Sequence, residues 1–298
     1  MSTDLWTPTA YADGNGARIA YDTYTPGRGG QPVLLITGLG ASRRWFPDGF
    51  AQALADKGLH PVRYDNRDSG ESTRFDHGSA NPLAALFGRR NRPYTCEDTA
   101  DDAAAVLDAL DIDAAHLFGI SMGGALAQRT ALRHPGRVRT LTTMSSFPGD
   151  RFGMKLLKHI NLKTARAFRT VDFPDTREGA VQTMLAISRL NASPNAPFDE
   201  EAALEQAERV ADNGIRDRRA QSRQMNARWH GDPIEKITAP TLVLHGEDDP
   251  LVKLSGAEET ARRVPGARLH TIPLVGHDLP ARCWNEIADR MTGDHEPA

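Results

Sequence analysis

The chain has 298 residues, enough for one large α/β domain with a sizeable core or for two small domains. Its composition, with 39% hydrophobic and 25% charged residues and a formal net charge of -3, is that of an ordinary soluble enzyme. This balance provides neither the basic surface that binds nucleic acid nor an acidic tail. We therefore expect a small-molecule substrate and no nucleic-acid partner.

No membrane or secretion signal is evident. The N-terminal segment lacks the basic and apolar regions of a signal peptide, and the longest apolar run, residues 33–39, is too short to span a bilayer. Cys96 and Cys283 lie far apart in no metal-ligand spacing, so free thiols in a reducing compartment are expected. We expect a cytoplasmic protein without metal or cofactor; the oligomeric state is open.

Short aliphatic runs alternate with amphipathic segments of helical length, a pattern typical of a parallel sheet with crossover helices. In chain order the first half predicts strands over residues 33–37, 60–65, 116–120 and 139–146, and helices over 45–57, 98–110 and 125–134. The strand pattern returns over residues 241–245 and 268–272. The expected fold class is α/β, with a mostly parallel central sheet flanked by helices.

Between residues 147 and 232 the alternation stops. Helix-like segments follow one another there with no strand between them, over residues 154–162, 180–190, 200–211 and 216–229. Because strands of one sheet flank this block, we expect a helical cap (147–232) inserted into a core made of residues 1–146 and 233–298. The connection over residues 75–94 is long, and such loops are usually functional or mobile.

The strongest motif surrounds Ser121. Residues 119–123 read Gly-Ile-Ser-Met-Gly, directly after a predicted strand and directly before a predicted helix. A G-x-S-x-G sequence in that setting is typical of a nucleophile elbow, a strained turn that projects the serine oxygen outward. The following helix also offers N–H groups and a partial positive charge to an oxyanion. Ser121 is the candidate nucleophile.

A serine hydroxyl needs a base to act as a nucleophile. In enzymes with a nucleophile elbow the catalytic residues follow along the chain in the order Ser, Asp or Glu, His. Asp248 and Asp249 come directly after the strand over residues 241–245, where an open α/β sheet places its site. The spacing Gly-x-x-Asp-x-x-Val resembles the acid motif of a known family of serine hydrolases, and this resemblance favours Asp249, with Asp248 left as the alternative. His277, in a Gly-His turn after the last strand-like run, is the candidate base.

An oxyanion hole commonly uses the N–H after the nucleophile and one from the loop after the first central strand. Met122 and Leu39 are the candidates for these two positions. Leu39 lies in a Gly-x-Gly loop that directly follows Thr37. The segment resembles the His-Gly-x-Gly loop of known hydrolases, with Thr37 in the position of the histidine. The loop lacks the third glycine and the lysine of a phosphate-binding motif, which argues against a nucleotide site.

These motifs together resemble the α/β-hydrolase superfamily over roughly residues 18–291. Residues 45–50, 59–73 and 276–280 are similar to the aclacinomycin methylesterase group, whose members hydrolyse a methyl ester on an aromatic polyketide. The turn over residues 67–70 has Arg-Asp-x-Gly where the wider superfamily has Arg-Gly-x-Gly. The resemblance implies a serine esterase, and it supports ester hydrolysis better than any particular substrate because the cap shows little similarity.

The same resemblance weighs other activities. Ser121 differs from the aspartate nucleophile of related dehalogenases and epoxide hydrolases, Met122 from the tryptophan of iminopeptidase-like enzymes, and Asp278 from the aromatic residue of many C–C bond hydrolases. Hydrolysis of a carboxylic ester, such as a methyl ester of a bulky hydrophobic or polyketide-like substrate, is the expected function. The alternatives are a lactonase, a thioesterase, a cofactor-free haloperoxidase or perhydrolase, or a non-catalytic hydrolase-like ligand receptor.

Overall fold

The computed structural model describes residues 5–76, 92–212 and 217–293, and within these ranges eight strands form one sheet in the order β1-β2-β4-β3-β5-β6-β7-β8. The six strands β3 to β8 run parallel to one another. The antiparallel hairpin of β1 and β2 extends the sheet beyond β4, to which β2 pairs antiparallel. The strands are β1 (Ala10–Gly14), β2 (Ala17–Thr23), β3 (Gln31–Ile36), β4 (Leu59–Tyr64), β5 (Ala115–Ile120), β6 (Val138–Met144), β7 (Thr241–Gly246) and β8 (Arg268–Ile272).

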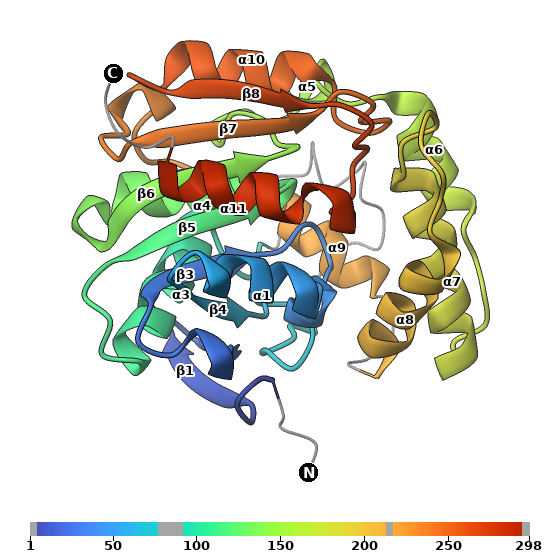
Figure 1. Cartoon of the computed structure of the whole chain (residues 1–298), viewed down its shortest axis with the longest axis horizontal. Helices are drawn as coiled ribbons and strands as arrows, with labels where there is room; N and C mark the ends of the chain where they lie inside the picture. Colours follow the sequence, from blue (N-terminus) through green and yellow to red (C-terminus); the bar gives the residue numbers. More distant parts are fainter. Residues whose placement is uncertain (1–4, 77–91, 213–216, 294–298) are drawn as a thin grey trace.

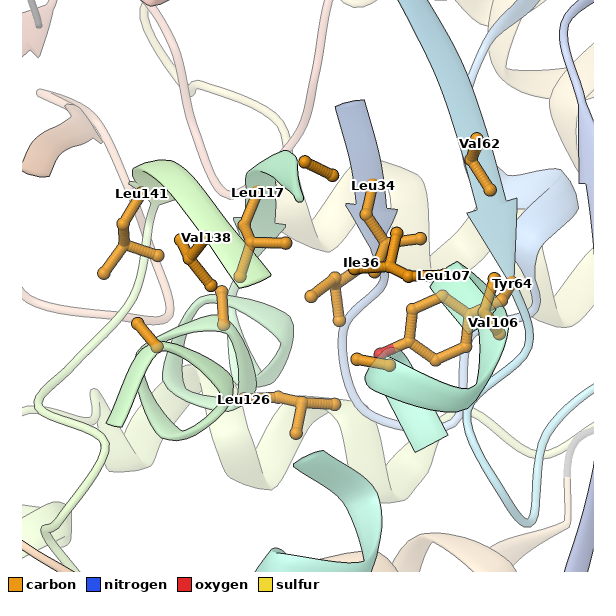
Figure 2. Close-up of a cluster of buried hydrophobic side chains, with 14 of the residues drawn as sticks. Leu34, Ile36, Val62, Tyr64, Val106, Leu107, Leu117, Leu126, Val138 and Leu141 are labelled. Carbon is orange, nitrogen blue, oxygen red and sulfur yellow. The ribbon is translucent and has the colours of Figure 1, made fainter. Parts of the chain in front are cut away.

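Helices cover both faces of this sheet, as Figure 1 shows. On one face α3 and α4 pack on alternate strand residues, so that Leu34 and Ile36 meet Val106, Leu107 and Leu126 (Figure 2). The intervening residues of β3, Val33 and Leu35, belong to the core on the opposite face, beneath α1 and α11. The flanking helices are α1 (Asp48–Asp56), α3 (Cys96–Ala109), α4 (Met122–Arg133), α10 (Leu254–Arg263) and α11 (Trp284–Gly293).

This arrangement confirms the predicted fold class. The aliphatic runs predicted as strands are buried strands because β3 to β7 are covered on both faces. The strands β1 and β2 and the helices α10 and α11 were not predicted from the sequence. Of the helices, the one predicted over residues 45–57 begins later, at Asp48, because Pro47 and a short 3-10 turn precede it.

Between β6 and β7 the chain forms a helical segment, residues 147–232, whose described parts contain no strand of the sheet. The single helix predicted over residues 154–162 is wrong: Ile160 forms an isolated bridge with Val252, and Asn161 caps a new helix. Most of the connection predicted over residues 75–94 lies outside the described residues. The helices of the segment are α5 (Met154–Leu157), α6 (Leu162–Thr170), α7 (Arg177–Asn191), α8 (Glu200–Ala211) and α9 (Arg218–Asn226).

In Figure 1, α6, α7 and α8 stand together beside the sheet, beyond one end of its strands, and α9 lies between them and the core. None of the described helices is long and apolar enough to cross a membrane. Cys96 and Cys283 are both buried and do not form a disulfide.

Candidate active site

Ser121 occupies the turn that joins β5 to α4. Its backbone has φ 57° and ψ -124°, a left-handed conformation that costs a non-glycine residue about 1–3 kcal/mol. The turn is held from below, because the Ser121 N–H donates to the Met144 carbonyl at 2.9 Å and the Ser146 hydroxyl donates to the Ser121 carbonyl at 2.6 Å. A Cβ at Gly119 would overlap the Gly123 carbonyl, so the motif glycines are required by close packing. The sharp turn leaves the Ser121 side chain at the surface of a pocket.

His277 lies in the same pocket and is oriented by Asp249. The distance from His277 Nδ1 to Asp249 Oδ2 is 2.8 Å, while Asp249 Oδ1 accepts the N–H groups of Leu251 and Val252, each at 2.8 Å. Burial by itself would raise the pKa of Asp249, but the charge and hydrogen bond of His277 outweigh it and hold that pKa below its ordinary value. The carboxylate is therefore ionised and fixes the imidazole.

The adjacent carboxylate, Asp248, has different partners. It accepts hydrogen bonds from the Ser193 hydroxyl at 2.5 Å and the Asn195 amide at 2.9 Å, both in the loop that follows α7. The geometry thus separates the two candidates left open by the sequence. Asp249 contacts His277, and Asp248 contacts the helical segment.

Ser121 and His277 are not hydrogen-bonded to each other in the described structure, although both line the pocket. Hydrogen bonds between a nucleophile and its base are often long before a substrate binds. The pocket has a volume of about 680 Å³, within the range of small-molecule sites. Its walls away from Ser121 are largely apolar side chains of the helical segment, among them Leu157, Ile160, Phe168, Met184 and Ile187.

Leu39 and Met122 line the same pocket as Ser121. In the part of the chain that the structure describes, neither backbone N–H donates to another protein group, so both are free to bind a ligand oxygen. Gly38 approaches closely enough that a Cβ there would lie 3.3 Å from Ser121 Cβ. The Leu39 loop therefore lies directly against the serine, which is the placement that the sequence predicts.

The contacts that α9 makes at the pocket were not predicted from the sequence. Arg223 forms a buried ion pair with Asp68, with Nε and Nη2 2.9 and 2.8 Å from its two carboxylate oxygens. Gln224 bonds to the loops after β3 and β4. Residues 68 and 223 are 155 positions apart, and no local pattern in one sequence indicates such a pairing.

His245 is a second residue behind the site. It is 1% exposed, its Nε2 lies 3.0 Å from the Val252 carbonyl and 3.9 Å from Asp249 Oδ2, and burial lowers its pKa. Burial thus favours the neutral form of His245, whose ring contacts the Asp249 loop at Val252. Among the described residues no group of three or more His, Cys, Asp or Glu side chains could hold a metal.

Comparison with known proteins places this geometry in a family. The model of the alpha/beta hydrolase fold matches residues 31–280. The rhodomycin D methylesterase DauP of Streptomyces sp. (strain C5) is 30% identical, over 86% of this chain and 88% of that protein. Its counterpart DnrP of Streptomyces peucetius is 28% identical with the same coverage.

The solved structures give the same result for the fold. The esterase RhEst1 from Rhodococcus sp. ECU1013 superimposes with a TM-score of 0.70, at 19% identity and over 96% of this chain and 99% of that one. Because the family model spans most of the chain and a relative of known activity aligns over nearly its whole length, the protein is an enzyme that belongs to the α/β hydrolase family.

Proposed function

We propose that this enzyme hydrolyses carboxylic esters with Ser121 as nucleophile, His277 as general base and Asp249 as the acid that orients it. The observation that carries the proposal is the 2.8 Å contact between His277 Nδ1 and Asp249 Oδ2, in the pocket that also exposes the strained Ser121. Side chains in these roles are what acyl transfer from an ester requires.

In the proposed mechanism His277 Nε2 takes the Ser121 proton as the serine oxygen attacks the ester carbonyl carbon. The carbonyl electrons move onto oxygen, and the N–H groups of Leu39 and Met122 bind the resulting oxyanion. The intermediate collapses, and the alcohol leaves with the proton from His277. Water activated by His277 then releases the acid and restores Ser121. The ionised Asp249 keeps His277 in the tautomer whose Nε2 accepts the proton.

The proposed substrate is a methyl ester of a bulky hydrophobic or polyketide-like acid. The relatives DauP and DnrP are named rhodomycin D methylesterases. The volume of about 680 Å³ and the apolar walls suit a large acyl portion, and a methyl leaving group needs no pocket of its own. In this proposal residues 147–232 act as a cap that forms these walls. A cytoplasmic location stays a prediction.

Labelling with a fluorophosphonate tests the nucleophile directly. The wild-type enzyme should be labelled on Ser121 with loss of fluoride, and Ser121→Ala should lose both the label and turnover, by about 10⁴-fold or more. Thermal unfolding of Ser121→Ala checks that the variant remains folded. Label on another residue, or hydrolysis that survives the substitution, would contradict the proposal; a folded wild-type protein that neither labels nor hydrolyses esters would indicate a ligand receptor.

A panel of esters tests the substrate class. Methyl esters of polycyclic aromatic acids should show a higher kcat/KM than methyl acetate and methyl butyrate, since the apolar walls gain contact only with a large acyl group. Matched p-nitrophenyl acetate controls for the intrinsic reactivity of the site. Preference for short acyl chains would refute the bulky-substrate proposal and leave the esterase proposal in place.

A further inference from the structure

One side chain of α9 joins the two loops that end at the pocket. Gln224 is 8% exposed, and its Oε1 accepts the Gly40 N–H at 2.9 Å. Its Nε2 donates to the Arg67 carbonyl and to the Ser69 hydroxyl, both at 2.9 Å. The Gly40 loop follows β3 and the Arg67 loop follows β4, so a single amide fixes the strand ends on one side of Ser121.

The loop that Gln224 holds is the one that carries the Leu39 N–H. Gly40 has φ +66°, and the Gln221 side chain fills the place that a Cβ at Gly40 would take. Lower in the same loop, the Thr37 hydroxyl donates to the Ala41 carbonyl at 3.1 Å. Gly40 N–H is bound to Gln224, whereas the neighbouring Leu39 N–H donates to no protein group in the described ranges and can bind a ligand.

The helix that supplies Gln224 is itself anchored to the core. Arg223, on the same turn, makes its ion pair with Asp68, whose backbone has φ 67° and whose carboxylate also accepts the Tyr94 hydroxyl at 2.7 Å. The exposed fractions of the Arg223 and Asp68 side chains are 3% and 0%. A charged, hydrogen-bonded pair at that burial keeps α9 in place before any substrate arrives.

We propose that Gln224 is a positioning residue for the oxyanion hole, and this inference rests on the ester hydrolase function proposed above. Gln224 fixes the peptide between Leu39 and Gly40 and so restrains the adjoining Gly38–Leu39 peptide, whose Leu39 N–H is then aimed at the site where the carbonyl oxygen becomes charged. A donor held in advance stabilises that charge without reorganising during the reaction, whereas a loosened donor loses part of its effect. The contribution therefore belongs to the transition state and not to substrate binding.

Gln224→Met tests this, because methionine keeps the approximate volume and removes both hydrogen-bonding groups. We expect kcat to fall by about 10–100-fold, less than the roughly 10²–10³-fold loss of an oxyanion donor outright, with KM changed by no more than about threefold. Gln206→Met is the matched control. Gln206 on α8 also ties the helical segment to the core, through Nε2 to the Trp45 carbonyl at 2.7 Å, but among the described residues it forms no hydrogen bond with the Leu39 loop.

A second readout separates positioning from a general loss of packing. The oxygen of Ser121 adds to the carbonyl carbon of an aryl trifluoromethyl ketone, and the adduct carries an oxyanion that resembles the reaction intermediate. The affinity for this inhibitor should fall in Gln224→Met by the same factor as kcat/KM and should stay unchanged in Gln206→Met. Ser69→Ala removes one partner of Gln224, and should weaken the inhibitor by about 2–5-fold even if Gln224→Met does not fold.

Wild-type inhibitor affinity in both Gln224→Met and Ser69→Ala, or an equal loss in Gln206→Met, would overturn the inference. Failure of the underlying function would look different. In that case the wild-type protein itself would not be labelled at Ser121, whereas a labelled, active wild type with an unaffected Gln224→Met variant rejects the positioning role alone.

Discussion

Two adjacent carboxylates after β7 have opposite surroundings. Asp249 is 1% exposed and contacts His277, while Asp248 contacts Ser193 and Asn195 in the helical segment. Burial alone would raise the pKa of Asp249, but the charge and hydrogen bond of His277, the charge of His245 and the hydrogen bond from the Val252 N–H together lower it. One side chain is thus placed to orient the imidazole and the other to hold the loop after α7.

Exchanging each carboxylate for its amide separates the two roles. Asp249→Asn should lower kcat by about 10³–10⁴-fold, because an asparagine at this position favours the wrong tautomer of His277. Asp248→Asn is the matched control and should keep kcat within about fivefold, since an amide still bonds to Ser193 and Asn195. Steady-state kinetics on one ester measures both. A larger loss in Asp248→Asn than in Asp249→Asn would reverse the assignment.

The sequence predicts the site residues that lie in local motifs. Ser121, Asp249 and His277 each follow a strand-like run. Because the carboxyl ends of parallel strands lie at one edge of the sheet, their positions after strands predict that they lie close together. The structure places them in that way, and their catalytic roles stay predictions. Gln224 could not be found in this manner, because its partners lie 155 to 184 residues away and no pattern in a single sequence joins them.

At the scale of elements, the loop that carries His277 is fitted against the end of α7. The His277 N–H donates to the Asn191 carbonyl at 2.7 Å, and a Cβ at Gly276 would overlap that same oxygen. Since the obstacle is main chain at a helix end, it cannot turn aside as a flexible side chain would. The position of His277 therefore depends on a glycine beside it.

Gly276→Ala should displace the His277 loop from α7 and lower kcat by at least about tenfold, because shifts of about 1 Å in a catalytic group cost this much or more. The matched control is Gly136→Ala, at a glycine where an added Cβ has no neighbour within 4 Å and no left-handed φ is required. Kinetics and circular dichroism on both variants check the effect. An active Gly276→Ala enzyme would show that the loop tolerates the displacement.

Strands could be predicted from the sequence where burial on both faces gives a continuous run of aliphatic residues. The strands β3 and β7 read as continuous aliphatic runs because helices cover both of their faces. The hairpin of β1 and β2 has no such run. Buried and exposed residues are mixed along β1, and β2, although mostly buried, contains polar and charged residues. The break between α5 and α6 also escaped prediction, because it arises from the bridge between Ile160 and Val252, a tertiary contact.

Across the whole molecule, a cluster of charges joins the helical segment to the core. Glu259 on α10 is buried, and its carboxylate lies 2.6 Å from Arg151 Nη2 and 2.6 Å from Lys158 Nζ, both in the segment. Burial alone would raise the pKa of Glu259, but hydrogen bonds from Lys158 and Arg151 lower it to about 2. The charged carboxylate therefore stabilises the attachment of the segment.

Glu259→Gln should destabilise the protein by about 2–3 kcal/mol at pH 7, because it removes the buried charge that accepts hydrogen bonds from Arg151 and Lys158. A pKa lowered by folding stabilises the folded state fully above the unfolded value of 4.5, and this contribution disappears as the pH falls toward 2. The difference in Tm from the wild type should be constant between pH 7 and 5 and shrink below pH 4.5. Glu258→Gln, on the exposed side of α10, is the control and should match the wild type. A pH-independent difference would refute the charge-based explanation.

The bond between His277 N–H and the Asn191 carbonyl uses main-chain atoms on both sides. Side-chain replacements along α7 leave it intact as long as the helix keeps its length and its terminus. The residues that face the pocket from this helix, Met184 and Ile187 among them, can therefore change without disturbing His277. The substrate range of such an enzyme can therefore change by substitutions that leave His277 in place. We expect its relatives to differ most in sequence along the helices that line the pocket.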